Sequence, residues 1–290
     1  MHISRFLGPA PGLRSFVRFY AQRAIRIRDG ALLHPVPARA APIVEFTFGD
    51  PINVRYLEQR GTKKSPLTVV VGPQTHRRLD LRLQGTVESF VIVFQPDGLQ
   101  RLFSVPMHEL TDRDYEAHAV LGVFISRARE RIANRESFLE RARLVDELLL
   151  HRALGSPRYD AISAAASEII RQGGREGIAD LAGRAGLSMR QFQRRFIQRV
   201  GMRPKLFARI VRFEAALESK ARSATKSWTD VAHEFGYHDQ MHMIHDFGEF
   251  AGGTPTETQI QLETVFVEQI GAIRAGNLAA NAIGDSRLIL

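Results

Sequence analysis

The 290-residue chain contains no cysteine and a single tryptophan. The missing thiols exclude disulfides, thiol nucleophiles and zinc sites with cysteine ligands, and they are typical of proteins from a reducing compartment. No apolar run reaches the ~18 residues that are needed to span a bilayer. The N-terminal stretch MHISRFLGPAPGLRSFVRFY has scattered arginines and no apolar segment typical of a signal peptide. We therefore expect a cytoplasmic chain with no membrane partner.

Basic residues are abundant overall but missing from one long stretch. The formal net charge of +9 favours a polyanionic partner, with nucleic acid ahead of a membrane surface. The segment from Arg184 to Phe213 holds nine Lys and Arg and no acidic residue, whereas Ser227 to Ile273 holds no Lys or Arg. Any function must accommodate both segments.

The first third of the chain has the pattern of short β-strands. Segments rich in β-branched and aromatic residues are separated by turns that contain glycine and proline. The expected strands lie at Ile43–Phe48, Leu67–Gly72, Leu79–Leu83 and Ser89–Phe94. Short strands with such turns predict a small barrel or sandwich.

The pattern changes to helix over residues 108–154, and the length of the chain predicts two domains. The helix Ser137–Leu154 gathers leucines on one face, and two interpretations stay open: it covers the core of the N-terminal domain, or it mediates dimerisation. Gly155–Pro157 is the best linker. The predicted organisation is an α+β chain with an N-terminal domain at 1–155, an all-α domain at 156–259 and a tail at 260–290.

An internal repeat lies within the helical half. Leu181–Leu187 matches Val231–Tyr237 at an offset of 50 residues. At an offset of 51, Phe196, Gly201 and Pro204 match Phe247, Gly252 and Pro255. A repeat of this period indicates a duplicated supersecondary unit.

The first copy predicts two helices joined by a tight turn. Leu181 belongs to an apolar stripe on the first helix, and Gly186 follows where a helix end favours a left-handed residue. Ser188 and Gln191 then form the pattern of a capping box. Helix, glycine turn and helix make a helix-turn-helix. The second helix of this motif, its recognition helix, enters the DNA major groove by its N-terminal part.

The exposed positions of that helix suit the edges of DNA bases. Arg190, Gln193 and Arg194 share one face, with Met189 and Ile197 beside them. Arginine pairs with guanine and glutamine with adenine, and each pair contributes ~1–3 kcal/mol of base discrimination. The basic residues that remain for phosphates or for structural ion pairs are Arg195, Arg199, Lys205, Arg209 and Arg212. Charge alone does not separate this interpretation from a merely solubilising helix face.

These residues resemble the AraC/XylS family of bacterial transcription regulators. Ile178–Leu217 resembles the first unit and connecting helix of the family, and Val231–Pro255 resembles its second unit. The positions that match the pattern of the second unit are Gly236, Tyr237, Asp239, Gln240, His242, Phe247, Gly252 and Pro255. The resemblance implies seven helices, with a long helix that sets two recognition helices in adjacent major-groove turns.

The resemblance and the exposed positions together give the expected DNA contacts. DNA contacts are predicted at Ser188, Met189, Arg190, Gln193, Arg194, Gln240, Met241 and His245, and phosphate contacts at Arg195, Arg199 and Lys205. Gln240 suits either a base or a phosphate. The implied partner is double-stranded operator or promoter DNA, with RNA polymerase and a second copy of the chain as further candidates. We expect no catalytic residue, metal or cofactor.

The front half resembles, more loosely, an uncharacterised sensing domain of the same family with a small cupin-like barrel. This resemblance implies a small-molecule effector but does not name it. Arg77, Arg78 and Arg82 suit either an anionic effector or a solvated strand face.

Three histidines, His238, His242 and His245, would share one face of a continuous helix and suggest a metal site. The resemblance instead makes Asp239 the N-cap, so that His238 precedes the helix and no third ligand remains at a suitable spacing. We expect His242 to be structural, with its ring hydrogen-bonded near the turn.

The second unit departs from the family pattern in charge. His245 stands where the family has Arg, Gly248 replaces Lys, and Met241 and Met243 replace Ser and Phe. Thr258 and Gln259 stand in place of an aromatic–Arg pair. Histidine carries charge only below its ordinary pKa of about 6.5. Because phosphate contacts supply much of the affinity for DNA, we hypothesise that the first unit supplies most of the binding.

Two alternatives come from other classes of protein. Small barrels can host metal-dependent enzymes, and Glu45 with either His34 or His76 could supply ligands, although no 2-His-1-carboxylate spacing is present. A surface histidine is the simpler interpretation of His76. The second alternative is an interaction module whose DNA binding has decayed, against which the cationic first unit argues.

Overall fold

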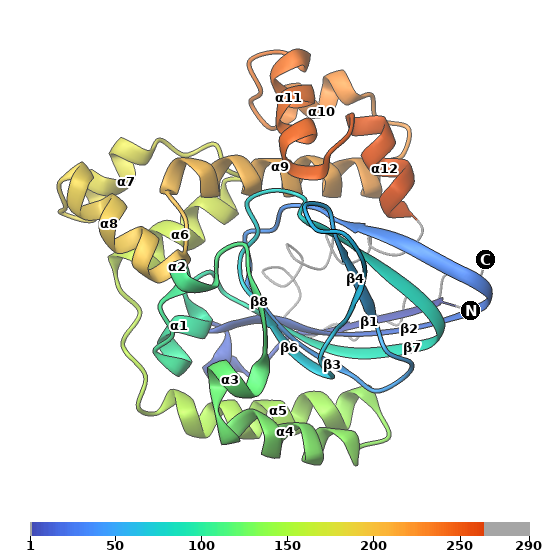
Figure 1. Ribbon diagram of the computed structural model, residues 1–290. Helices are drawn as coiled ribbons and strands as arrows, with labels where there is room; N and C mark the ends of the chain where they lie inside the picture. The colour runs from blue at the N-terminus through green and yellow to red at the C-terminus, as the bar shows by residue number, and fades with distance from the viewer. Residues whose placement is uncertain (1, 264–290) are drawn as a thin grey trace.

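The structure is a computed structural model that describes residues 2–263. From residue 264 onward, the tail predicted at 260–290 lies outside the described residues. The N-terminal half forms one curled antiparallel sheet with helices on its outside, and the C-terminal half is helical (Figure 1). This arrangement confirms the α+β prediction.

Two long strands form the spine of the sheet. The strands are β1 (His2–Leu7), β2 (Val17–Val36), β3 (Ile43–Thr47), β4 (Asn53–Tyr56), β5 (Lys63–Lys64), β6 (Thr68–Val71), β7 (Leu79–Phe94) and β8 (Asp114–Glu116). β2 pairs with β7 from Val17 opposite Phe94 to Val36 opposite Leu79, with a shift of register between Ile27 and Leu32. The sheet order is β1-β2-β7-β3-β6-β8. In addition, β4 pairs with the first residues of β7, from Leu79 to Arg82. A long pair with a shifted register lets one sheet bend around on itself.

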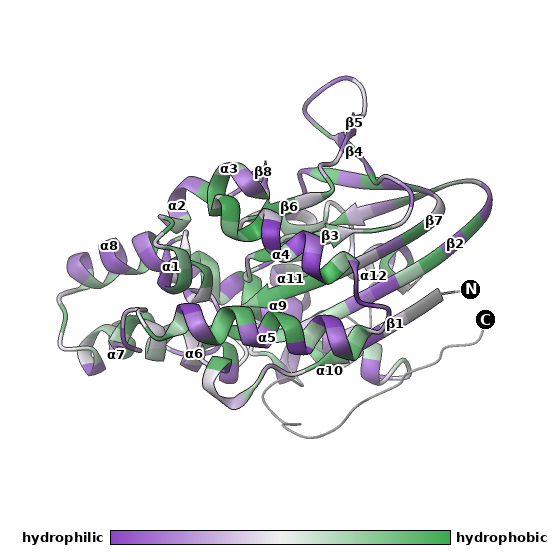
Figure 2. Cartoon of the chain, turned by 90° about the horizontal axis from the view of Figure 1, so that it is seen from below, coloured by the Kyte–Doolittle hydropathy of each residue, from purple (hydrophilic) through white to green (hydrophobic). Residues whose placement is uncertain are grey.

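Helices cover the outer face of this sheet. They are the 3-10 turn η1 (Pro11–Leu13), α1 (Gly98–Phe103), α2 (Met107–Leu110), α3 (Ala117–Leu121), α4 (Val123–Ala133) and α5 (Phe138–Ala153). Ser137 caps α5 in a capping box with Glu140. Leu144 and Leu149 of α5 are buried in the core that also holds Phe90, and hydrophilic and hydrophobic residues alternate along this helix (Figure 2). The helix therefore covers the core of the N-terminal domain with Leu144 and Leu149, while Leu150 stays 38% exposed on its outer side.

The helical half has the predicted duplicated plan. Within the described residues it comprises seven helices: α6 (Ala161–Arg171), α7 (Ile178–Arg184), α8 (Met189–Val200), α9 (Pro204–Arg222), α10 (Trp228–Glu234), α11 (Gln240–Ala251) and α12 (Pro255–Glu263). α9 runs between the cluster of α6–α8 and the cluster of α10–α12 (Figure 1). Phe196 packs on Phe207 at one end of α9, and Phe213 packs on Phe247 toward the other. Both units therefore share one hydrophobic core.

No helix within residues 2–263 is long and apolar enough to cross a membrane.

Candidate nucleic-acid interface

The first unit folds as its sequence predicts. Leu181 of α7 is buried, and Gly186 makes the turn with a φ of 64°. The Ser188 Oγ accepts a hydrogen bond from the backbone N–H of Gln191 at 3.3 Å, and the Gln191 side chain accepts one from the Ser188 N–H at 3.1 Å. This capping box starts α8 at Met189. Phe192 and Phe196 are fully buried, and this fixes which face of α8 points outward.

The outward face of α8 carries the predicted cations. Arg190, Gln193, Arg194 and Arg195 are all exposed, as is Met189 at 39%. Within the described part of the chain, the three arginines form no salt bridge. Their guanidinium groups are therefore available to an external anion or to base edges.

Arg199 departs from the predicted phosphate set. Its Nη2 lies 2.8 Å from the Asp160 carboxylate, and its Nη1 donates to the Gln100 side chain at 3.3 Å. These contacts tie α8 to Asp160, the N-cap of α6, and to α1. Arg195 and Lys205, the other two residues predicted to contact phosphates, are exposed.

The second unit repeats the backbone plan of the first. Gly236 makes the turn with a φ of 65°. The Asp239 Oδ1 accepts from the His242 N–H at 2.7 Å, which caps α11 and lowers the pKa of the Asp239 carboxyl. The predicted N-cap is confirmed, and His238 precedes the helix with its side chain almost fully exposed.

The outward face of α11 carries no permanent cation. Gln240, Met241, His245 and Gly248 are exposed there, and Met241 is 68% exposed. A Cβ added at Gly248 would meet nothing within 4 Å, so no packing contact requires this glycine. The backbone plan is conserved between the two units while the charge is not.

An ion-pair network, which the sequence did not reveal, neutralises the cation nearest α11. Arg209 of α9 lies 2.6 Å from both the Asp246 and the Glu249 carboxylates. These hydrogen bonds and ion pairs raise the pKa of Arg209 against the opposing effect of burial. Asp246 is completely buried. The sequence placed two acids three residues apart on α11, but it could not show which cation of α9 they meet.

The three histidines do not gather around one point. The His242 ring packs edge-on against Tyr237 with 5.6 Å between centroids, in place of the expected hydrogen bond. Within residues 2–263, His245, Asp246 and Glu249 are the one group of three side chains whose potential ligand atoms lie close enough, within 4.8 Å, to hold a metal. Arg209 already bonds both of these carboxylates, so a guanidinium stands where a cation would bind.

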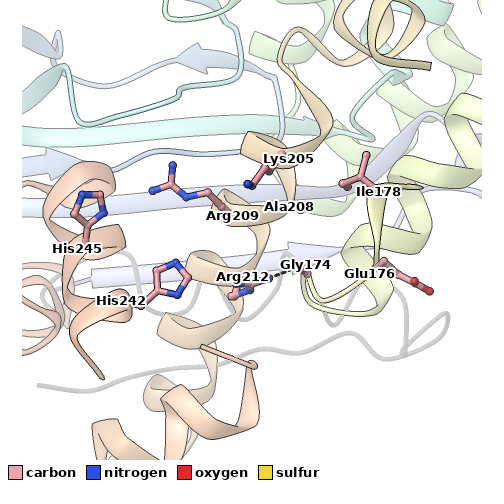
Figure 3. Close-up of a pocket in the computed structure, with 9 residues that line it drawn as sticks. All are labelled: Gly174, Glu176, Ile178, Lys205, Ala208, Arg209, Arg212, His242 and His245. Atoms are coloured by element: carbon pink, nitrogen blue, oxygen red, sulfur yellow. Dashed lines mark hydrogen bonds between the residues drawn. The ribbon is translucent and has the colours of Figure 1, made fainter. Parts of the chain in front are cut away.

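A cleft of about 600 Å³ opens between α9, α11 and the start of α7. Lys205, Arg209 and Arg212 line it from α9, and His242 and His245 line it from α11 (Figure 3). Arg212 donates to the Gly174 carbonyl at 2.9 Å across the cleft. Glu176 and apolar side chains complete the lining, and Arg209 is already paired with two carboxylates there.

A smaller cavity of about 60 Å³ lies against the curled sheet of the N-terminal domain. Its polar lining includes Arg23, Arg39, Glu45 and Gln74 among aliphatic side chains. Arg23 and Glu45 form a buried ion pair at 2.7 Å. Burial lowers the pKa of Arg39 to about 10, against the attraction of Glu214 and Glu45. Gln74 is 1% exposed, and within the described residues its Oε1 has no hydrogen-bond partner.

Three of the other residues considered for the N-terminal half, Arg77, Arg78 and His34, are paired, stacked or buried within the fold. Arg77 pairs with the buried Asp80 at 2.7 Å, and Arg78 lies over the Tyr56 ring. His34 is buried, and burial together with Arg23 and Arg77 lowers its pKa to about 3. The remaining two side chains are exposed or half-exposed, namely Arg82 on its strand and His76 beside Thr75 and Asp112. Among the described residues, His34, Glu45 and His76 form no three-ligand group.

Comparisons with known proteins match both halves of the chain. A family model described as a helix-turn-helix domain matches residues 181–261, and a domain of unknown function (DUF6597) matches residues 5–116. No curated protein sequence matches the chain.

Solved structures that align with the chain include ToxT from Vibrio cholerae O395, at 10% identity and a TM-score of 0.47 over 91% of this chain and 98% of that chain. ToxT from Vibrio cholerae strain SCE256 with a bound unsaturated fatty acid aligns at 10% identity and a TM-score of 0.48. The alignment covers 91% of this chain and 96% of that chain. The AraC-like transcriptional activator CuxR aligns at 10% identity and a TM-score of 0.27. The alignment covers 66% of this chain and 74% of that chain.

The duplicated capped units on a shared connecting helix and the two family matches agree with the resemblance seen in the sequence. The chain carries a helix-turn-helix domain in its C-terminal half, behind an N-terminal domain of unknown function.

Proposed function

We propose that the protein is a sequence-specific DNA-binding transcription regulator whose two helix-turn-helix units contact adjacent turns of the major groove. The observation that carries this proposal is the outward face of α8, where Arg190, Gln193 and Arg194 stand exposed on a rigid, capped helix. Their side chains have the donors and acceptors that distinguish guanine and adenine in the major groove.

The connecting helix supports the proposed spacing. α9 has 19 residues, which corresponds to ~28 Å at 1.5 Å per residue. One turn of B-DNA repeats after about 34–36 Å. A helix of this length, with the width of the units at its two ends, suits recognition helices that enter consecutive major-groove turns on one side of the duplex.

The first unit supplies most of the affinity in this proposal. α8 presents three arginines that form no salt bridge within residues 2–263, whereas α11 has no arginine and its neighbour Arg209 is held by two carboxylates. Ser188 and Met189 would add contacts at the start of α8. The second unit contributes shape and modest specificity through Gln240, Met241 and His245.

The N-terminal domain is the proposed site of a small-molecule effector. Its cavity of about 60 Å³ combines aliphatic side chains with Arg39 and Gln74. Ligand pockets typically measure ~300–1,000 Å³, so an effector would bind only where this cavity widens. RNA polymerase and a second copy of the chain belong to the proposal as further partners.

Selection of duplexes from a random pool by the full-length protein tests the proposal, with salt titration of the selected sequences. We expect an enriched motif with two parts one helical turn apart, and affinity that falls steeply with salt because phosphate contacts release counterions. Loss of enrichment in Arg190→Ala/Arg194→Ala, but not in a variant of the exposed Arg143, Arg143→Ala, would assign the binding to α8. Weak binding without any enriched motif would refute sequence-specific recognition.

A further inference from the structure

The N-terminal domain contacts equivalent ends of both helix-turn-helix units. Gly201 ends α8 and Gly252 ends α11, and these glycines correspond to each other in the repeat. Both take the left-handed conformation, with φ values of 96° and 77°. The last residues of each recognition helix lie against the N-terminal domain, so the two helices are held at matching points.

The end of α8 is held by the segment after α2. The Thr111 hydroxyl donates a hydrogen bond to the Gly201 carbonyl at 2.8 Å. A Cβ added at Gly201 would lie 2.5 Å from the Thr111 Oγ1 and 3.0 Å from the Met107 carbonyl oxygen. These atoms leave no room for a side chain at Gly201. A shift of the segment 107–112 toward α8 must therefore move the end of α8.

The end of α11 is held by the β2–β3 connection. The Ala38 N–H donates to the Phe250 carbonyl at 2.7 Å, and the Arg77 Nη1 donates to the Ala251 carbonyl at 3.4 Å. The Ala40 N–H donates to the Glu214 carboxylate of α9 at 3.0 Å. Ala38 and Ala40 are buried within the core of the helical domain. The N-terminal domain thus enters the core of the DNA-binding half.

Hydrogen bonds join the two holding points to each other. Arg39 and Gln74 exchange two backbone hydrogen bonds of 2.9 and 2.8 Å. The Asp112 carboxylate accepts from both the Thr75 N–H and the Thr75 hydroxyl at 2.7 Å. Asp112 itself has a φ of 58°, a backbone conformation that a non-glycine residue keeps only where its surroundings enforce it. We call the segments 38–40, 72–77 and 107–112 the clamp.

We propose that the clamp sets the distance between the two recognition helices, so that the N-terminal domain determines which spacing of DNA half-sites the protein binds. Thr111 is then a positioning residue for α8, and Arg77 is one for α11. The statement about the spacing of DNA half-sites rests on the proposed function. The statement about the distance between the two helices does not. α9 alone is a single helix that can bend, whereas two ends fixed to one body cannot move independently.

The clamp also borders the cavity of the N-terminal domain. Arg39 and Gln74 form the bridge between the two holding points, and their side chains line the cavity. A molecule that bonds these side chains would act directly on the helix spacing.

Spin labels measure the distance without DNA. The chain has no cysteine, so Met189→Cys and Met241→Cys give two unique label sites at the starts of α8 and α11. We expect one narrow distance distribution in this parent. Thr111→Val removes the hydroxyl that donates to the Gly201 carbonyl but keeps the shape of the side chain. This variant should broaden or shift the distance distribution. Thr111→Ser should restore the narrow distribution, and Thr62→Val in the exposed β4–β5 hairpin should leave it unchanged. An unchanged distribution in Thr111→Val overturns the proposal.

Arg77→Lys gives a second test should Thr111→Val fail to fold. Lysine keeps a charge beside Asp80 but is expected to lose the contact with Ala251, so the distribution should broaden from the α11 side. A distribution as narrow as that of the parent again overturns the proposal.

DNA binding gives the second readout, with unlabelled chains and duplexes whose half-site spacing varies by single base pairs. We expect Thr111→Val to reduce the preference for the best spacing by about fivefold, the factor typical of one hydrogen bond. A merely structural role would lower affinity equally at all spacings and would contradict the proposal. If the parent shows no sequence preference, the proposed function fails, and the spin-label distances still decide on the clamp.

Discussion

The two helix-turn-helix units have the same interior and different surfaces. Phe196 and Phe247 occupy equivalent buried positions, and Ser188 and Asp239 both cap the recognition helix of their unit. On the outside, α8 presents Arg190 and neighbouring cations, while α11 presents Met241 and His245 and no lysine or arginine.

This difference separates what a repeat needs to fold from what it needs to bind. A change inside the core leaves a cavity or a clash, so both copies keep phenylalanine, glycine and a capping residue at corresponding positions. A change on the outward face has little effect on folding, so charge can differ freely between copies. We therefore expect the two units to contribute about equally to stability and unequally to the proposed DNA binding.

The largest effect is expected from the shared core. Phe196→Ala and Phe247→Ala should each lower the free energy of unfolding by about 3–5 kcal/mol, because each leaves a cavity the size of a ring. Urea denaturation of the full chain measures both. The exposed Leu57→Ala serves as the control, with a change of less than ~0.5 kcal/mol. A large loss in one phenylalanine variant and none in the other would contradict the equal role of the two units.

The next largest effect concerns the unequal surfaces. Arg194→Ala should weaken binding to the selected duplex by ~1–3 kcal/mol and relax the preference at one base position. His245→Ala should cost less, because a histidine ring stands in the second unit where the first unit has the arginine Arg194. Fluorescence anisotropy at fixed salt measures both variants. A larger loss from the histidine change would reverse the proposed order of the units.

The buried His34 of the N-terminal domain makes the stability of the protein depend on pH, so variants of the two units must be compared at a fixed pH. The pKa of His34 falls from 6.5 in the unfolded chain to about 3 in the folded protein, so the unfolded state binds more protons below pH 6.5. Stability is therefore present above pH 6.5 and is lost as the pH falls toward 3, by about 2 kcal/mol between pH 7 and pH 5.

Denaturation of His34→Leu at both pH values isolates this loss, since leucine cannot be protonated. His108→Leu, which changes an exposed histidine, is the matched control. A pH dependence in His34→Leu equal to that of the parent would show that another group is responsible.

A smaller gain is expected from restoring a cation to the second unit. Gly248→Lys places an amine in open space on α11 and should steepen the slope of log affinity against log salt by about 0.9, the effect of one phosphate contact. Gly248→Ala is the control: it should stabilise the helix by ~1 kcal/mol and leave the slope unchanged. An unchanged slope in the lysine variant would place Gly248 away from the phosphates.

The smallest effect is expected from metal ions. Asp246 and Glu249 are bonded to Arg209, so neither a chelator nor zinc should change the melting temperature. A saturable rise with zinc that disappears in His245→Ala would show that Arg209 yields its place to a metal.

Local patterns predicted much of this protein because they depend on neighbours in the chain. The turn at Gly186 and the caps at Ser188 and Asp239 follow from left-handed backbone geometry and from the unpaired N–H groups at a helix start. The spacing of the repeat predicted the duplicated unit. The proposed DNA contacts on α8 follow once its buried face is known.

Other features depend on residues far apart in the sequence. Arg199 bonds Asp160 and Gln100, and Arg209 bonds Asp246 and Glu249. No local sequence pattern distinguishes these two arginines from Arg194. The role of the helix at 138–153 stayed open in the sequence because one apolar face suits either a sheet or a partner chain.

The sequence by itself determined the two kinds of domain, the repeat and the unequal charge of its copies, because composition and spacing act over a few residues. Only the tertiary structure decided which arginines stay available and how Thr111 and Ala38 hold the ends of the two recognition helices. The physical reason is that ion pairs and backbone hydrogen bonds depend on distance in space, which folding sets for residues that the chain keeps far apart.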